Sequence, residues 1–214
     1  VYALTYDKKA AIVKYKGNEK NIKIAKIDGY AVASIGSGVF KNNKTVTSIT
    51  LPSTLNGIYK GAFAGTTNLD SISIPDSVTV IGSRAFYGSG IKSISFGNGS
   101  KLKNIGSGAF ERTTQLTSIK LPSGITDIKE RTFYCSGIKG VGLPKNLTKI
   151  GRLAFAGSKL ETVGIPSVVT EIGYGAFKNA TSLAKITFAS SSTSLLIRDE
   201  VFYDTGLNTI SIPG

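Results

Sequence analysis

The stretch Ile81-Gly82-Ser83-Arg84-Ala85-Phe86 decides the fold, because its pattern recurs along most of the chain. The final phenylalanine returns every 22 to 25 residues, as Phe40, Phe63, Phe86, Phe110, Phe133, Phe155, Phe177 and Phe202. An isoleucine lies five residues before each of them, as Ile35, Ile58, Ile81, Ile105, Ile128, Ile150, Ile172 and Ile197. A period of roughly 20–29 residues over three or more copies predicts a solenoid, in which each repeat packs mainly on its neighbours.

Each repeat also contains a short strand pattern ahead of this turn. In the repeat of Phe86 the strand runs to Ile74, and Ile72 and Ile74 alternate with polar residues, which predicts one buried face. Proline follows the strand in six repeats and, having no N–H to donate, ends the ladder there, as Pro52, Pro75, Pro122, Pro144, Pro166 and Pro213. A second extended segment, such as residues 78–81, leads back.

The end of the repeat gives two further expectations. Gly82 and its counterparts are expected to let the backbone turn. The Ala-Phe pair that follows is expected to form a single helical turn that buries the ring. The counterparts of Gly82 are Gly36, Gly106, Gly151 and Gly173.

Residues 1–26 do not fit the repeat, and we interpret them as an N-terminal β-hairpin cap that covers the apolar end of the first coil. Residues 27–214 form the repeats. Two repeats lack the proline and carry lengthened turns, at residues 97–100 and 189–194. The chain stops directly after a strand pattern, at Pro213-Gly214, so we expect the natural protein to continue. The absence of an initiator methionine indicates that a leader was removed before Val1.

Composition restricts the function. The chain has 26 basic and 13 acidic residues, a net charge of +13, which favours anionic partners unless the lysines simply solvate a long, thin surface. It has no histidine, so the commonest general base and metal ligand are missing, and a Ser-His-Asp triad is excluded. The single cysteine, Cys135, excludes an internal disulfide, and we expect its thiol to be buried and inert. We therefore predict no enzyme activity, no metal and no cofactor. No apolar run is long enough to span a membrane.

The units Leu-Thr-Ser-Ile-Lys-Leu-Pro-Ser-Gly-Ile-Thr-Asp-Ile (116–128) and Val-Thr-Glu-Ile-Gly-Tyr-Gly-Ala-Phe (169–177) resemble BspA-type leucine-rich repeats. The resemblance covers residues 27–214. It implies an α/β solenoid, a right-handed leucine-rich-repeat superhelix of about eight repeats that is predominantly β with short helical turns. It also implies a bacterial surface or secreted protein, and several members bind host matrix proteins. Ligands differ between members, so no binding residue is carried over.

The candidate ligand-binding surface is the polar face of the parallel sheet that the main strands should form. We take four lysines and four hydroxyl residues on it as candidates: Lys92, Lys120, Lys139, Lys185, Thr50, Ser73, Ser95 and Thr187. The alternative is that serine and threonine only suit a solvated strand face. Three tyrosines that follow the repeat phenylalanine are expected to pack beside a shortened turn: Tyr87, Tyr134 and Tyr203.

These observations favour a non-enzymatic cell-surface or secreted interaction module that acts in adhesion or protein binding through the sheet face. Its partner would be a protein or a glycan, with a host extracellular-matrix protein as one candidate. Two alternatives stay open. The chain is a structural spacer that displays other domains, or it binds polyanionic glycan or nucleic acid by charge, with nucleic acid the less favoured of these.

Overall fold

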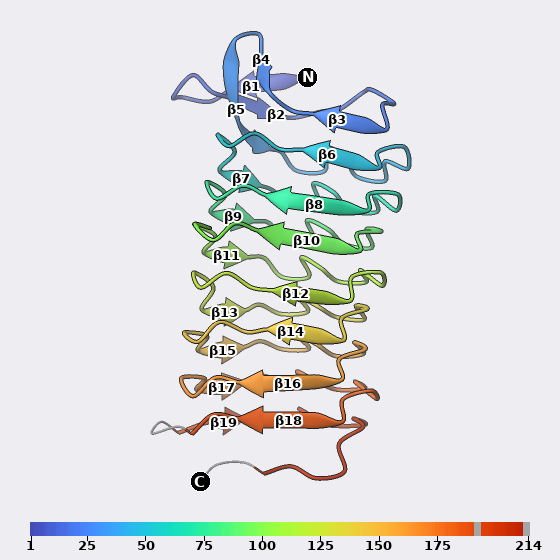
Figure 1. The fold of residues 1–214 in the computed structure, drawn as a ribbon, viewed down its shortest axis with the longest axis vertical. Helices are drawn as coiled ribbons and strands as arrows, with labels where there is room; N and C mark the ends of the chain where they lie inside the picture. Colours follow the sequence, from blue (N-terminus) through green and yellow to red (C-terminus); the bar gives the residue numbers. More distant parts are fainter. Residues whose placement is uncertain (191–193, 212–214) are drawn as a thin grey trace.

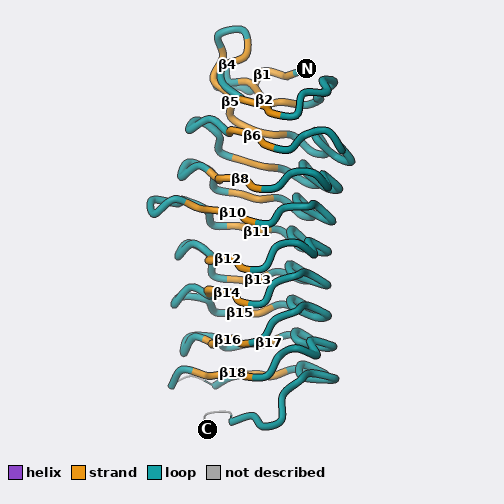
Figure 2. Tube along the Cα trace, turned by 45° about the vertical axis from the view of Figure 1, so that its right-hand side comes forward, coloured by secondary structure: helices purple, strands orange, loops and turns teal. Residues whose placement is uncertain are grey.

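The computed structural model describes residues 1–190 and 194–211. The chain winds through coils stacked along one long axis, with the N-terminus at one end and the C-terminus at the other (Figure 1). Each coil has a longer strand on one side and a two-residue strand on the other, joined by loops (Figure 2). The predicted solenoid of about eight coils is confirmed. The described residues contain no helix.

The strands on each side pair in parallel, coil on coil. The longer strands are β6 (Ser48–Thr50), β8 (Ser71–Ile74), β10 (Ser93–Phe96), β12 (Ser118–Lys120), β14 (Gly140–Gly142), β16 (Thr162–Ile165) and β18 (Lys185–Phe188). The short strands are β7 (Gly57–Ile58), β9 (Val80–Ile81), β11 (Asn104–Ile105), β13 (Asp127–Ile128), β15 (Lys149–Ile150), β17 (Glu171–Ile172) and β19 (Leu196–Ile197).

Registry keeps equivalent residues side by side. Ile72 pairs with Ile94, and Ile58 pairs with Ile81, so each apolar position forms a column through the core. In β8 the isoleucines are buried and the serines exposed, as the alternation predicted. In the described part of the chain the longer strands form two ladders, β3-β6-β8-β10 and β12-β14-β16-β18.

The first residues form a hairpin and then join the stack. β1 (Tyr2–Leu4) and β2 (Ala10–Ile12) are antiparallel, whereas β2 lies parallel to β5 (Tyr30–Ile35). β3 (Asn21–Lys23) is already parallel to β6, and β4 (Lys26–Ile27) pairs with β5 in a second hairpin. The ring of Tyr15 lies 4.9 Å from that of Phe40, at the end of the phenylalanine column. The division of the chain at residue 26 stays a prediction.

The repeat phenylalanines form one continuous stack through the core. Neighbouring ring centroids are 5.2–5.4 Å apart for the first six pairs and 5.9 Å apart for the last, with interplanar angles of 3–10°. Phe110 is fully buried between Phe86 and Phe133. Ile81, Ala85 and Phe86 of the opening hexapeptide all have 0% exposure. The hexapeptide therefore points its apolar residues inward, as the pattern predicted.

The turn that carries the phenylalanine is not helical, which corrects the expected helical turn. The residues two before and two after the ring have positive φ, as at Gly61 (φ 61°) and Gly65 (φ 67°) around Phe63. The N–H groups of Gly61, Phe63 and Gly65 donate to carbonyl oxygens of the next coil at 3.0, 2.7 and 2.7 Å. An α-helix would direct these donors back along its own turn. The alternating backbone directs them along the solenoid axis instead.

The glycine at the position of Gly82 has a different role from the expected one. Neither Gly82 nor Gly106 has a positive φ. A Cβ on Gly106 would lie 2.3 Å from the backbone nitrogen of Ser83, so a side chain there would collide with the preceding coil. Glycine at these two positions provides close approach of neighbouring coils rather than freedom to turn.

The prolines end the longer strands as predicted. Pro52 follows β6, and its carbonyl accepts a hydrogen bond from the N–H of Leu55 at 3.0 Å, which closes a turn. The lengthened turn at residues 97–100 protrudes beyond its neighbours after β10 (Figure 2). Part of the other lengthened turn, residues 189–194, lies outside the described residues, as does Pro213-Gly214.

Truncating a ring in the middle of the stack should weaken folding. We expect Phe110→Ala to lower the free energy of unfolding by about 3–5 kcal/mol, because it leaves a cavity between two buried rings. Phe202→Ala should cost less, since Phe202 is half-buried and ends the stack. Urea unfolding followed by circular dichroism measures both changes. An equal loss of unfolding free energy in the two variants would contradict a larger contribution of the central rings to stability.

Candidate functional site

The eight residues predicted on the sheet face are all exposed. Ser95 pairs with Ser73 in the first ladder, and Thr187 pairs with Gly164 in the second. The structure therefore places the candidates on one side of the solenoid but divides them between two ladders. Thr50 lies in β6 of the first ladder, whereas Lys120 lies in β12, the first strand of the second.

Ion pairs reduce the number of available lysines on this face. The Lys92 ammonium lies 2.8 Å from the Asp70 carboxylate, and that of Lys139 lies 3.2 Å from Glu161. Lys120 and Lys185 have no ion pair among the residues that the structure describes. Exposed pairs of this kind contribute little stability, but each neutralises a cation that a ligand would otherwise meet.

Three positions in the strands of the second ladder are glycines and lack side chains: Gly140, Gly142 and Gly164. We call these three positions the glycine depression. Beside it, Lys120, Gly142 and Lys145 line a groove of about 550 Å³ whose walls also include Leu143. Apolar surface and two cations meet here. Gly142 belongs both to the glycine depression and to this groove.

The phenylalanine turns form a second surface, which we call the turn edge. It consists of the residues from four before to two after each repeat phenylalanine. The loops that form it are aligned along one side of the solenoid (Figure 2). It contains all five arginines of the chain: Arg84, Arg112, Arg131, Arg152 and Arg198. It also contains every tyrosine outside the first 30 residues: Tyr59, Tyr87, Tyr134, Tyr174 and Tyr203. Arginine and tyrosine are the residues most enriched at binding hot spots, together with tryptophan.

Cations of the turn edge lie over its tyrosine rings. The Arg131 guanidinium carbon is 4.1 Å from the Tyr134 centroid, and the Lys178 ammonium is 4.7 Å from that of Tyr203. Arg84 lies 5.7 Å from the ring of Tyr87. Tyr87 and Tyr134 are half-buried, but Tyr203 is 61% exposed. These tyrosines therefore contact cations of the turn edge, and a packing role beside the shortened turn stays a prediction.

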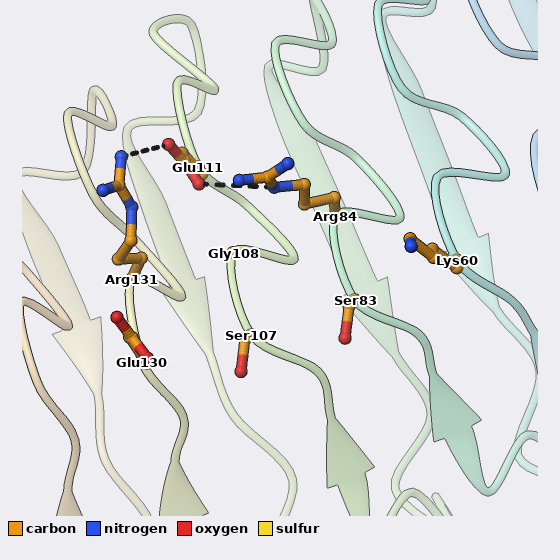
Figure 3. A pocket seen from close by; sticks show the side chains of 8 residues that line it. All are labelled: Lys60, Ser83, Arg84, Ser107, Gly108, Glu111, Glu130 and Arg131. Atoms are coloured by element: carbon orange, nitrogen blue, oxygen red, sulfur yellow. Dashed lines mark hydrogen bonds and ion pairs between the residues drawn. The ribbon is translucent and has the colours of Figure 1, made fainter.

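Glu111 is a buried carboxylate at the centre of the turn edge. Its side chain is 3% exposed and lies between Arg84 and Arg131 (Figure 3). Arg131 donates to Oε1 at 2.6 Å, whereas Nε of Arg84 is 3.9 Å from Oε2. The hydrogen bond to Glu111 raises the pKa of Arg131. Oε2 of Glu111 and Nε of Arg131 are buried without hydrogen-bond partners.

The turn edge is hollowed on the N-terminal side of Glu111. One groove of about 490 Å³ is lined by Lys41, Lys60, Arg84 and Tyr87 over a floor that includes Gly61. Lys60 and Arg84 also line a second groove of about 330 Å³ that reaches Glu111 and Arg131. The two grooves are neighbours that share Lys60 and Arg84, and Figure 3 shows the residues that line the second one.

Cys135 is half-buried, not buried as expected, and it lines a different groove of the same edge, together with Tyr134 and Tyr174. Its φ is 51°, so its place is set by the positive-φ position two residues after Phe133. Across residues 1–190 and 194–211, no group of three or more Cys, Asp or Glu side chains has an arrangement suited to a metal ion.

The turn edge was missed by reasoning from strand patterns, although the sequence contains a signal for it. All five arginines lie within four residues of a repeat phenylalanine, a grouping that hydrophobic periodicity does not require. The burial of Glu111 carries no local signal, because its partner Arg131 comes from the next coil.

A protein-family model matches most of the sequence. The model of the BspA-type leucine-rich repeat region, in six copies, matches residues 33–159 and 103–214. The chain belongs to the BspA-type leucine-rich repeat family. The resemblance of units 116–128 and 169–177 is thereby confirmed. A comparison with curated proteins gave no match.

Solved structures agree with this family. A leucine-rich cell surface protein from Faecalibacterium prausnitzii A2-165 is 34% identical, with a TM-score of 0.79, over 89% of this chain and 53% of that one. This chain thus spans about half the length of that protein. The leucine-rich repeat protein of T. pallidum is 24% identical, with a TM-score of 0.65, over 87% of this chain and 78% of that one. The pneumococcal vaccine antigen PcpA is 18% identical, with a TM-score of 0.50, over 91% and 60%. The latter two show the fold alone.

The BspA-type family links the chain to bacterial leucine-rich surface proteins. Within the described residues, no helix has the length and apolar character needed to cross a bilayer.

Removing Arg131 tests the buried charge cluster. We expect Arg131→Gln to lower the free energy of unfolding by about 1.5–3 kcal/mol, because Glu111 then loses its charged hydrogen-bond donor while buried. Arg152→Gln is the matched control: it removes the same group from Glu130, an exposed partner at 2.8 Å, and should cost less than about 1 kcal/mol. Urea unfolding compares the two. Glu111→Gln in the Arg131→Gln background should restore part of the loss, and equal losses in the two single variants would rule out a special role for Glu111.

Proposed function

We propose that the protein is a non-enzymatic interaction module of the bacterial surface or of the secreted fraction that binds a protein ligand through the sheet face. The observation that carries the proposal is the glycine depression. It is a place on the sheet where missing side chains, apolar walls and two cations meet. The similar protein from F. prausnitzii is a cell surface protein, which supports a surface location for this protein too.

An extended segment of a protein ligand suits this surface. Side chains on one face of an extended segment repeat about every 6.6 Å, and one of them would enter the glycine depression while the segment crosses the exposed hydroxyls of neighbouring strands. Lys120 and Lys145 would then pair with acidic side chains of the ligand. Lys185 and Thr187 extend the same face in β18, whereas Lys92 and Lys139 are already paired with acids.

Filling the glycine depression tests this proposal without changing charge. A Cβ on Gly140 meets nothing within 4 Å, and one on Gly164 meets only the Thr187 hydroxyl at 3.4 Å, so Gly140→Gln with Gly164→Gln should fold. We expect this double variant to lose at least about tenfold in affinity for a matrix protein that the native chain binds, measured against a panel of purified extracellular-matrix proteins. Ser37→Gln with Ser107→Gln adds the same groups at exposed positions of the turn edge, away from the sheet face, and should leave binding unchanged.

The same panel separates the alternatives. Binding that persists when salt is raised from 0.1 to 0.5 M supports contact through packing, because exposed charge contacts are screened at such ionic strength. Binding that disappears with salt would favour a charge-driven polyanion binder. No binding to any member of the panel would favour a structural spacer.

A further inference from the structure

The strand pairing of the solenoid stops at one place along its axis. On the sheet face, β10 ends the first ladder and β12 begins the second. Among the short strands, β11 ends one ladder and β13 begins another, between the same two coils (Figure 1). We call this place the junction. It lies between the coil of residues 91–113 and the coil of residues 116–138, and the structure describes both coils in full.

Backbone hydrogen bonds that recur at other coils are missing at the junction. The N–H groups of Lys139, Thr148 and Gly151 each donate to the preceding coil at 2.8 Å. Their counterparts one coil earlier have no such bond within residues 91–138: Thr117, Thr126 and Lys129. Each coil of a solenoid is held by its neighbours alone, so the loss of these bonds weakens this one interface.

The phenylalanine turns still connect the two coils. The N–H groups of Gly108, Phe110 and Arg112 donate across the junction at 2.9, 2.9 and 2.8 Å. The rings of Phe110 and Phe133 remain stacked, with centroids 5.4 Å apart. The turn edge is therefore continuous at the junction, whereas the strands on the two other sides are not paired across it.

The lengthened turn after β10 attaches its coil to the preceding one. Lys101 follows this turn and donates its N–H to the Asp76 carbonyl at 2.9 Å. A Cβ on Gly97 would lie 2.1 Å from the Asp76 carboxylate, so glycine allows the turn to approach that side chain. Ile94 and Phe96 of β10 are only half-buried, whereas both isoleucines of β8 are buried. The coil before the junction thus fits its N-terminal neighbour, and its main strand is partly uncovered.

A buried ion pair crosses the junction on the turn edge. Arg131 donates to Glu111 at 2.6 Å, and the Glu111 side chain is 3% exposed. The backbone carbonyl of Glu111 accepts from Gly88 before the junction, whereas the N–H of Arg131 donates to Arg152 after it. Each partner is therefore anchored on its own side. Separating them leaves a buried carboxylate without its charged donor, which favours the closed arrangement.

We propose that the junction is a hinge. The coils before it and the coils after it are two blocks that bend relative to one another about the turn edge, and the pair of Arg131 with Glu111 is the latch that holds them closed. A hinge confines the change in backbone conformation to a few residues while the packed units move as rigid bodies. Bending moves β12 relative to β10 and so changes the sheet face where the two ladders meet. The hinge does not depend on the function proposed for that face.

Distances between spin labels test the hinge. Each of three cysteine pairs spans three steps between neighbouring strands, at one exposed repeat position of the sheet face. The pair Thr50→Cys with Lys120→Cys crosses the junction. The pair Lys23→Cys with Ser95→Cys lies before the junction, and the pair Lys120→Cys with Thr187→Cys lies after it.

Double electron–electron resonance measures the three distance distributions in chains that also carry Cys135→Ser. We expect the crossing pair to have the widest distribution. Arg131→Gln should widen it further and add longer distances, because the latch is lost, while the pairs within a block stay unchanged. Arg152→Gln is the matched control: its ion pair with Glu130 lies within the second block, so all three distributions should stay unchanged.

Three results would overturn the proposal. Equal widths for the three pairs in the native background would exclude the hinge. An unchanged crossing pair in Arg131→Gln would exclude the latch, and so would an equal effect of Arg152→Gln on that pair. Circular dichroism establishes beforehand that every labelled variant is folded, so that a change of distance is not a loss of structure.

Amide hydrogen exchange followed by nuclear magnetic resonance checks the missing bonds without any substitution. The N–H groups of Thr117, Thr126 and Lys129 should be at least about tenfold less protected than the hydrogen-bonded N–H groups of their counterparts one coil later. Equal protection of the two sets would show that the coils are paired at the junction and would overturn the hinge.

Discussion

The hydrogen-bond ladder of the phenylalanine turns is the constraint on which the rest of the structure depends. Three N–H groups in each of the first seven such turns donate to the next coil, as those of Gly61, Phe63 and Gly65 do, and the rings of these turns are stacked. Together they hold adjacent rings 5.2–5.4 Å apart through the first seven coils. Because the spacing is constant, every repeat position becomes a column along the solenoid.

These columns determine which side chains become neighbours on the surface of the solenoid. A single side chain at one repeat position has a neighbour from the coil above and another from the coil below. On the sheet face, lysines therefore form ion pairs with acidic residues of adjacent coils, as Lys139 does with Glu161. On the turn edge it brings Glu111 between Arg84 and Arg131, which are 47 residues apart in the chain. Charge on this protein is therefore organised along the axis, not along the sequence.

The repeat, the buried faces and the family could be read from the sequence, because each depends on local periodicity. The apolar columns follow from residues such as Ile72 and Ile74, whose spacing alone predicts burial. The conformation of the phenylalanine turn could not be read in this way. Positive φ is expected at glycine, but the same position also holds Arg84 and Leu153, whose residue types predict a right-handed backbone.

The sheet-face candidates illustrate a second limit. Their exposure follows from alternation, and all eight are exposed. Whether each lysine is available depends on which acid stands in the neighbouring coil, and that requires the register of the ladders. Lys92 and Lys120 are both exposed lysines, yet Lys92 is paired with Asp70, while Lys120 lines a groove.

The position two residues before the ring shows how one backbone requirement produces different surfaces. Glycine satisfies it without strain and leaves a hollow, as at Gly38 and Gly61. A larger residue costs about 1–2 kcal/mol in the left-handed region and places a side chain on the edge, as at Arg84 and Arg131. Since each coil contacts only its neighbours, this choice is made coil by coil without altering the stack. Glycines and larger side chains therefore follow one another in an irregular order along an edge whose backbone is constant, and the turn that holds the coils together also shapes the surface of that edge.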